Sequence, residues 1–175
     1  WDIFEDNCYE AAKTAGVLDE RLLDKVRTEM EGVKPMKAVF DPFYVKRLHG
    51  PNVKTGKNKR DLADQVRADI RQFKEANKCD RLVMIWCGST EIFAQEGPAH
   101  QDLASFEKAL ETSDISIPSS MIYAYAAIKE GIPYANGAPN LSADIPALQE
   151  LAAQTKTPIT GKDFKTGQTL MKTIL

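Results

Sequence analysis

Three short segments combine the side chains and turn residues that a polar ligand needs. They are Gly88-Ser-Thr-Glu91, Asn136-Gly-Ala-Pro-Asn140 and Gly161-Lys-Asp-Phe-Lys-Thr-Gly-Gln-Thr169. Asparagine, serine and threonine can hydrogen-bond to a polyhydroxylated molecule, and lysine adds positive charge. The third segment also has a strand-turn-helix pattern, in which backbone N–H groups and a helix N-terminus attract an anion. These segments predict a site for a phosphorylated small molecule.

The lysines of the third segment could also take part in chemistry. The pKa of a lysine falls when its ammonium group is desolvated or faces another positive charge. Such a lysine can carry a proton or stabilise a developing oxyanion. Lys162, Lys165 and Lys172 lie in or just after this segment. Their spacing alone does not distinguish a catalytic lysine from an exposed structural one, so both interpretations stay open.

Several common kinds of site are not indicated. A Walker motif needs Lys-Ser/Thr after its second glycine, whereas Gly167 is followed by Gln-Thr, and no GxGxxG fingerprint is present. The three cysteines have no CxxC spacing, and the only two histidines, His49 and His100, are far apart. We therefore expect no metal site. Cys87 lies in an apolar run and is expected to be a buried, reduced thiol.

The composition indicates a soluble globular protein. Of the 175 residues, 43% are hydrophobic and 27% are charged, and the formal net charge is −2. A dedicated nucleic-acid binder would usually be basic. No apolar run approaches the roughly 20 residues of a membrane span, and no signal peptide opens the chain. These features predict a cytoplasmic protein that binds neither nucleic acid nor membrane.

The elements that must position the three segments follow from apolar spacing and turn residues. Helices are predicted over 19–30, 62–77, 103–110, 119–130 and 144–153, and strands over 82–87, 132–135 and 158–160. The continuous apolar run at 82–87 is typical of a strand buried on both faces. Helices alternating with such strands predict an α/β fold with a parallel sheet, whose ligands bind at the carboxyl ends of the strands.

Four segments, in order, resemble the inositol-3-phosphate synthase family. Residues 83–91 (Val-Met-Ile-Trp-Cys-Gly-Ser-Thr-Glu) resemble the family's apolar strand ending in Trp-Thr-x-Asn-Thr-Glu, and residues 117–124 resemble its Ser-Pro-Ser-Thr-x-Tyr-Ala. Residues 130–140 resemble Glu-Gly-x-Pro-x-x-Asn-Gly-Ser-Pro-Gln-Asn, and residues 161–169 resemble Gly-Asp-Asp-x-Lys-Ser-Gly-Gln-Thr. The opening Trp1-Asp-Ile is similar to the family's Gly-Trp-Asp-Ile.

The resemblance implies a fold and a reaction. It places residues 1–116 in the later part of a Rossmann-type NAD-binding domain, and residues 117–175 at the start of an inserted α/β domain for catalysis and tetramer assembly. The family isomerises glucose 6-phosphate to inositol 3-phosphate, a step of inositol and phospholipid biosynthesis. Bound NAD oxidises C5, the enolate then formed attacks the C1 aldehyde, and the NADH reduces C5 again.

The resemblance also implies roles for single residues. Lys165 is implied as the leading catalytic residue and as a substrate contact, and Lys172, seven residues further on, as a second catalytic residue. The cofactor contacts are implied to be Ser89, Thr90, Ser119, Ser120 and Asp163. The remaining substrate contacts are implied to be Asn136, Gly137 and Asn140.

Departures from the family pattern leave other functions open. Lys162 replaces the first of two aspartates, and Leu170 stands where lysine is frequent. These changes support a non-catalytic relative that binds NAD or a phosphosugar, and a structural oligomerisation module is a further alternative. The family's glycine-rich pyrophosphate loop is expected upstream of Trp1, and further lysines beyond Leu175. We therefore expect the 175 residues alone to be inactive and to bind NAD weakly.

Overall fold

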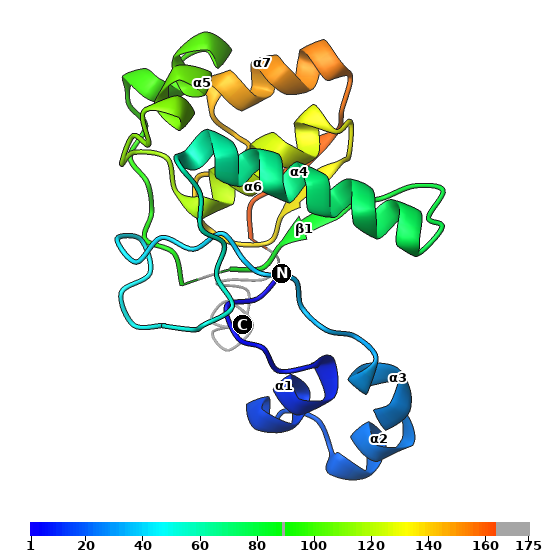
Figure 1. The fold of residues 1–175 in the computed structure, drawn as a ribbon. Coiled ribbons are helices and arrows are strands. Elements are labelled where there is room, and N and C mark those ends of the chain that lie inside the picture. The colour runs from blue at the N-terminus through cyan, green and yellow to red at the C-terminus, as the bar shows by residue number, and fades with distance from the viewer. Residues whose placement is uncertain (89, 164–175) are drawn as a thin grey trace, which may run out of the picture. The chain divides into compact units, whose positions relative to one another are not determined.

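The computed structural model describes residues 1–88 and 90–163, and its chain divides into two compact units. The first unit contains residues 1–40 and 47–54, and the second contains residues 41–46 and the chain from Thr55 onward. Figure 1 colours the chain by residue number. The domain boundary expected at residue 117 stays a prediction.

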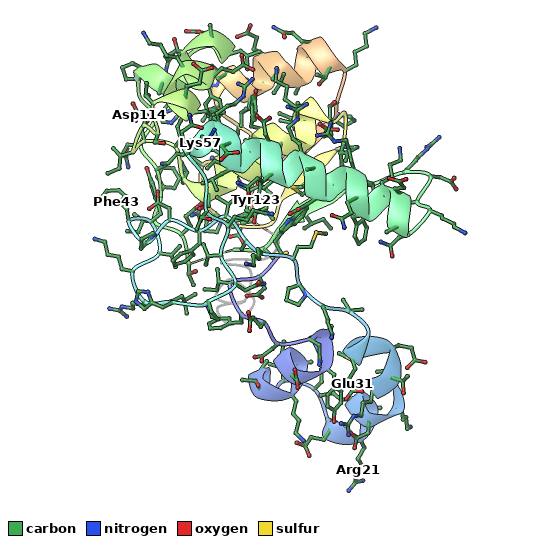
Figure 2. All side chains as sticks on the ribbon, viewed as in Figure 1. Arg21, Glu31, Phe43, Lys57, Asp114 and Tyr123 are labelled. Atoms are coloured by element: carbon green, nitrogen blue, oxygen red, sulfur yellow. The ribbon has the colours of Figure 1, made fainter. Side chains whose placement is uncertain are left out.

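The first unit carries three short helices, α1 (Cys8–Ala15), α2 (Glu20–Lys25) and α3 (Arg27–Glu31). Asn7 and Glu10 form a capping box that satisfies the first N–H groups of α1. Asp19 caps α2, because its side chain accepts the Arg21 N–H. The single helix predicted over 19–30 is wrong, because the chain leaves helical geometry at Val26 (φ −119°) and continues as α3. Arg21 on α2 and Glu31 on α3 are labelled in Figure 2.

A three-stranded parallel sheet forms the centre of the second unit. Its strands are β1 (Met84–Trp86), β2 (Tyr134–Asn136) and β3 (Ile159–Gly161), hydrogen-bonded in the order β1-β2-β3. In this register, Tyr134 pairs with Met84 on one side and with Ile159 on the other. The predicted α/β class and the parallel arrangement are confirmed.

The helices of the second unit gather over one side of this sheet (Figure 1). α6 lies directly on β1 and β2, while α4 and α7 pack against α6, and α5 contacts both α4 and α7. These helices, with one 3-10 turn, are α4 (Lys59–Ala76), η1 (Pro98–His100), α5 (Leu103–Glu111), α6 (Ser119–Lys129) and α7 (Pro146–Thr155).

α6 is the central helix of the second unit. Every residue from Ser119 to Ile128 is buried, and its alanines let neighbouring helices approach closely. Tyr123, labelled in Figure 2, packs beside Trp86 of β1 with ring centroids 5.4 Å apart. The helix ends at Lys129, and Gly131, two residues further on, has a φ of +69°, the left-handed conformation that glycine adopts freely. Tyr123 and Tyr125 are both buried in the packing around this helix.

The burial expected for the first strand is wrong. Met84 is buried, but Ile85 is 56% exposed and Val83 is 64% exposed. Cys87, expected to be a buried thiol, is also exposed. α6 covers only one face of β1, and no other described helix contacts the opposite face closely. Within the described residues, no helix is both long and apolar enough to span a membrane.

Candidate functional site

The carboxyl ends of the three parallel strands lie at one edge of the sheet and bring the predicted ligand segments together. The end of β1 contacts the segment after β2, because the Gly137 N–H donates to the Trp86 carbonyl oxygen at 2.8 Å. The segment after β3 joins them, because the Asp163 N–H donates to the Ala138 carbonyl oxygen at 3.1 Å. This edge is therefore the candidate site.

Gly161 lets β2 and β3 approach closely at this edge. Its φ is +107°, a conformation that residues with a side chain rarely adopt. A Cβ atom at this position would lie 2.2 Å from the Asn136 carbonyl oxygen. Both the backbone conformation and the space require glycine here.

Asn136 and Asn140 shape the segment between β2 and α7. Both are buried, and both use their amide groups internally. Asn136 Nδ2 donates to the Asn140 carbonyl oxygen at 2.7 Å, and Asn136 Oδ1 accepts from the Ala138 N–H at 3.0 Å. Asn140 Nδ2 donates to the Glu91 carbonyl oxygen. These bonds fix the segment, and direct ligand contacts by Asn136, Gly137 and Asn140 remain a prediction.

Glu91 is a buried carboxylate that the sequence reasoning did not select as a site residue. Its side chain reaches the start of α6, where Oε1 accepts from the Ser120 N–H at 3.1 Å. Burial raises the pKa of the Glu91 carboxyl, and the hydrogen bonds from Ser120 and Asn140 offset this only in part. The sequence feature that could have indicated Glu91 is its position shortly after a predicted strand. Its partner lies 29 residues away, which no local pattern reveals.

The predicted cofactor contacts Thr90, Ser119 and Ser120 lie next to this carboxylate in the chain or in space. Thr90 is exposed beside Glu91. Ser119 is the first residue of α6, and Pro118 occupies the N-cap position. The Ser119 hydroxyl is buried and has no hydrogen-bond partner among the described residues. It can therefore bond to a ligand or a water molecule without losing an existing contact.

A cavity of about 350 Å³ opens where β2, β3 and the start of α7 meet. Lys162 lies at this end of β3, and its Nζ forms an ion pair with Asp144 Oδ2 at 3.0 Å. Asp144 also accepts the Ser142 N–H at 3.0 Å. The lining residues are Asn136, Ala143, Asp144, Gln149, Ile159, Thr160 and Gly161.

The predicted site residues Ser89, Lys165 and Lys172 lie outside the described residues, as does Leu170. Asp163 is described, with φ +61°, and its side chain is partly buried. The roles expected of Asp163, Lys165 and Lys172 remain predictions. Across residues 1–88 and 90–163, His, Cys, Asp and Glu form no group of three or more that could hold a metal ion.

Lys59 is a second charged residue whose role the sequence did not show. It belongs to the basic stretch 54–60, Lys-Thr-Gly-Lys-Asn-Lys-Arg. Its Nζ donates to the carbonyl oxygens of Asp114 at 2.9 Å and Ile117 at 2.6 Å. It also lies 3.4 Å from Asp41 Oδ2. Desolvation lowers the pKa of Lys59, and this lysine holds the chain that leads into α6.

Known proteins resemble this chain over its whole length. Inositol-3-phosphate synthase 1 of Bacteroides thetaiotaomicron is 50% identical over 176 residues, covering 100% of this chain and 41% of that protein. Inositol-3-phosphate synthase of Brassica napus is 35% identical, covering 100% of this chain and 35% of that protein. The chain thus spans less than half the length of these relatives.

The structural comparison agrees. The crystal structure of inositol-3-phosphate synthase from Caenorhabditis elegans matches with a TM-score of 0.90 and 32% identity, covering 98% of this chain and 34% of that one. The NAD-binding family described as Myo-inositol-1-phosphate synthase matches residues 1–174, which confirms the predicted resemblance and NAD as the family's cofactor. The chain belongs to the NAD-binding family of myo-inositol-1-phosphate synthases.

Proposed function

We propose that this chain is part of an isomerase that converts glucose 6-phosphate to inositol 3-phosphate with NAD as a recycled cofactor. The observation that carries the proposal is the 50% identity, over the whole chain, to a protein named inositol-3-phosphate synthase. The strand-end segments that carry the sequence resemblance also lie together at one edge of the sheet. We further propose a cytoplasmic homotetramer, on the family resemblance alone.

The described residues fit a nicotinamide dinucleotide at this edge. The ribose hydroxyls and the carboxamide of NAD need hydrogen-bonding groups at the carboxyl ends of parallel strands. Such groups are supplied by the exposed Thr90 and by the Ser119 hydroxyl, which has no partner among the described residues. When bound, NAD supplies a hydride acceptor and, as NADH, a hydride donor. Thr90, Ser119 and Ser120 are the residues proposed to hold it, with Ser89 and Asp163.

The other proposed roles are the stabilisation of negative charge during the reaction and the positioning of the substrate loop. An enolate and a developing alkoxide are stabilised by fixed positive charge in a site that excludes water. We assign this stabilisation, and proton transfer, to Lys165, with Lys172 as the second proposed lysine. Asn136 and Asn140 hold the loop beside the proposed substrate site through their internal hydrogen bonds.

The non-catalytic alternative loses part of its support. It rests on Lys162, which adds a positive charge where the family has an aspartate, and on Leu170. Lys162 is neutralised by Asp144 at 3.0 Å, so its charge is not left free at the candidate site. An ion pair of partly exposed groups of this kind is compatible with a working site.

Turnover by the protein encoded by the complete reading frame tests the proposed function. Glucose 6-phosphate and NAD would be supplied, and inositol phosphate would be measured together with NADH. We expect product to form without net NADH. NAD binding without any product would contradict the proposal and favour the non-catalytic relative.

Replacing Lys165 tests the proposed mechanism. Lys165→Ala in the complete protein is expected to reduce turnover at least about 100-fold, within the range that a positioned proton-transfer group contributes. NAD affinity is expected to stay within about twofold. Lys108→Ala, which removes an exposed lysine from α5, is the matched control and should leave both values unchanged. Undiminished turnover in Lys165→Ala would remove Lys165 from the mechanism.

A further inference from the structure

α6 begins without a cap from its own sequence. Pro118 is the N-cap residue and makes no side-chain hydrogen bond to the first turn. The first N–H groups of a helix need acceptors, and a negative charge at this end is favourable. The carboxylate of Glu91, which follows β1, provides both through its 3.1 Å contact with the Ser120 N–H. α6 is thus capped from another part of the chain.

The same residue also holds the segment after β2. Asn140 Nδ2 donates to the backbone carbonyl oxygen of Glu91, and it also faces Glu91 Oε2 at 3.5 Å. The chain just beyond Glu91 is fixed as well, because the Ile92 N–H donates to the Tyr44 carbonyl oxygen at 2.8 Å. Glu91 therefore connects the end of β1, the start of α6 and the loop that contains Asn136 and Asn140.

We propose that Glu91 is a positioning residue, which sets the spacing between the Ser119–Ser120 turn and the 136–140 loop and so prepares the ligand-binding edge before a ligand arrives. The inference rests on the proposed function for the identity of the ligand, but not for the geometry. Glu91 touches no reacting atom in this role. It acts through Ser120 and Asn140.

The energetics of the buried charge favour a positional role over a stabilising one. Glu91 is only 6% exposed, and no described Lys, Arg or His forms an ion pair with it. Tyr44, Tyr134 and Lys59 are the described titratable groups whose own ionisation responds to its charge. Burial raises the pKa of Glu91, so folding disfavours its ionised form. A buried acidic group whose ionised form is disfavoured by folding is expected to serve the site rather than stability.

Glutamine is the informative replacement, because it keeps the shape but has one acceptor oxygen. Glu91 Oε1 faces the Ser120 N–H, and Oε2 faces Asn140 Nδ2. In Glu91→Gln the amide can accept from Ser120 only by turning its NH₂ group toward the NH₂ group of Asn140. Two donors then face each other, which weakens the link between the start of α6 and the 136–140 loop. Glu91→Asp keeps both acceptor oxygens on a shorter side chain, so it should retain part of the positioning that Glu91→Gln loses.

The experiment compares three variants of the complete protein: Glu91→Gln, Glu91→Asp and, as matched control, Glu107→Gln. Glu107 also accepts hydrogen bonds at α6, but from Tyr125 and Lys129, away from the ligand edge. Hydrogen exchange of the peptides covering 119–122 and 137–141 measures how well these two segments are held in place. Titration with NAD measures the affinity for NAD, and the melting temperature measures the stability of the fold.

We expect Glu91→Gln to exchange faster in these two peptides and to bind NAD about 10-fold more weakly, with a melting temperature near that of the unmodified protein. Glu91→Asp should lie between the two. Glu107→Gln should leave NAD affinity and both peptides unchanged. Exchange and affinity like those of the unmodified protein, or a loss of protection throughout the chain in both Glu91 variants, would overturn the inference.

The outcomes also separate this inference from the proposed function. If the unmodified protein binds no NAD, the proposed function fails, and the exchange of the two peptides still decides the role of Glu91. If it binds NAD and forms inositol phosphate while Glu91→Gln behaves like the unmodified protein, only the positional role fails.

Discussion

Gly161 shows how a single residue controls the candidate site. We expect Gly161→Ala to destabilise the protein by about 1–3 kcal/mol, the usual strain for such a backbone conformation. Urea denaturation would measure the change. Gly97→Ala is the control, because Gly97 has a φ of −148° and nothing lies within 4 Å of its Cβ position. Equal stabilities for the two variants would contradict the close approach of β2 and β3.

Residue types alone predicted many of the residues at this edge of the sheet, but not the hydrogen bonds between them. Asn136, Gly137 and Asn140 could be selected from the sequence, because turn residues after a strand indicate a ligand loop. The side-chain amides of Asn136 and Asn140 turn inward, and the Asn140 amide bonds to Glu91, 49 residues away. Hydrogen bonds over such separations follow from the tertiary fold and have no local signature.

Lys59 fixes the segment that leads into α6, because it bonds to two carbonyl oxygens of that segment. Lys59→Met is expected to lower the free energy of unfolding by about 1–3 kcal/mol, since the carbonyl oxygens of Asp114 and Ile117 lose a charged donor. Chemical denaturation would measure it. Lys57→Met is the control, because Lys57 is exposed on the same basic stretch. Asp114 and Lys57 are labelled in Figure 2. A cost no larger than that of the control would show that Lys59 is only a surface lysine.

The positions of the helices were predicted better than the burial of the strand faces. α4, α5, α6 and α7 were all anticipated, because repeated apolar residues and end signals define helices locally. β1 was placed correctly, but its continuous apolar run suggested burial on both faces, and Ile85 is exposed. The spacing of apolar residues in a sequence indicates which side chains of a strand favour burial. Which face is covered depends on elements elsewhere.

For the molecule as a whole, acid is expected to loosen the packing of α4, α5 and α6. Partial burial alone would raise the pKa of Glu107, but hydrogen bonds from Lys129 and Tyr125 outweigh it and hold the pKa below its ordinary value. A lowered folded pKa stabilises the protein above the unfolded pKa, near 4.5, and this stabilisation is lost as pH falls through the folded value.

Denaturation between pH 6 and pH 3 measures this contribution. The Glu107 part should be no more than about 1 kcal/mol, because solvent screens partly exposed pairs. Glu107→Gln should remove it and flatten the stability curve over this range. An unchanged pH dependence in Glu107→Gln would show that other carboxyls account for the acid sensitivity.

The exposure of Cys87 has a practical consequence for studying this protein. The thiol lies just beyond β1, directly before the Gly88–Glu91 segment, and the chain contains only two other cysteines, Cys8 and Cys79. After those two are replaced by serine, a maleimide dye on Cys87 would report from the ligand-binding edge itself. Changes in its fluorescence as NAD is added would then follow loop movement in real time, without any need for turnover.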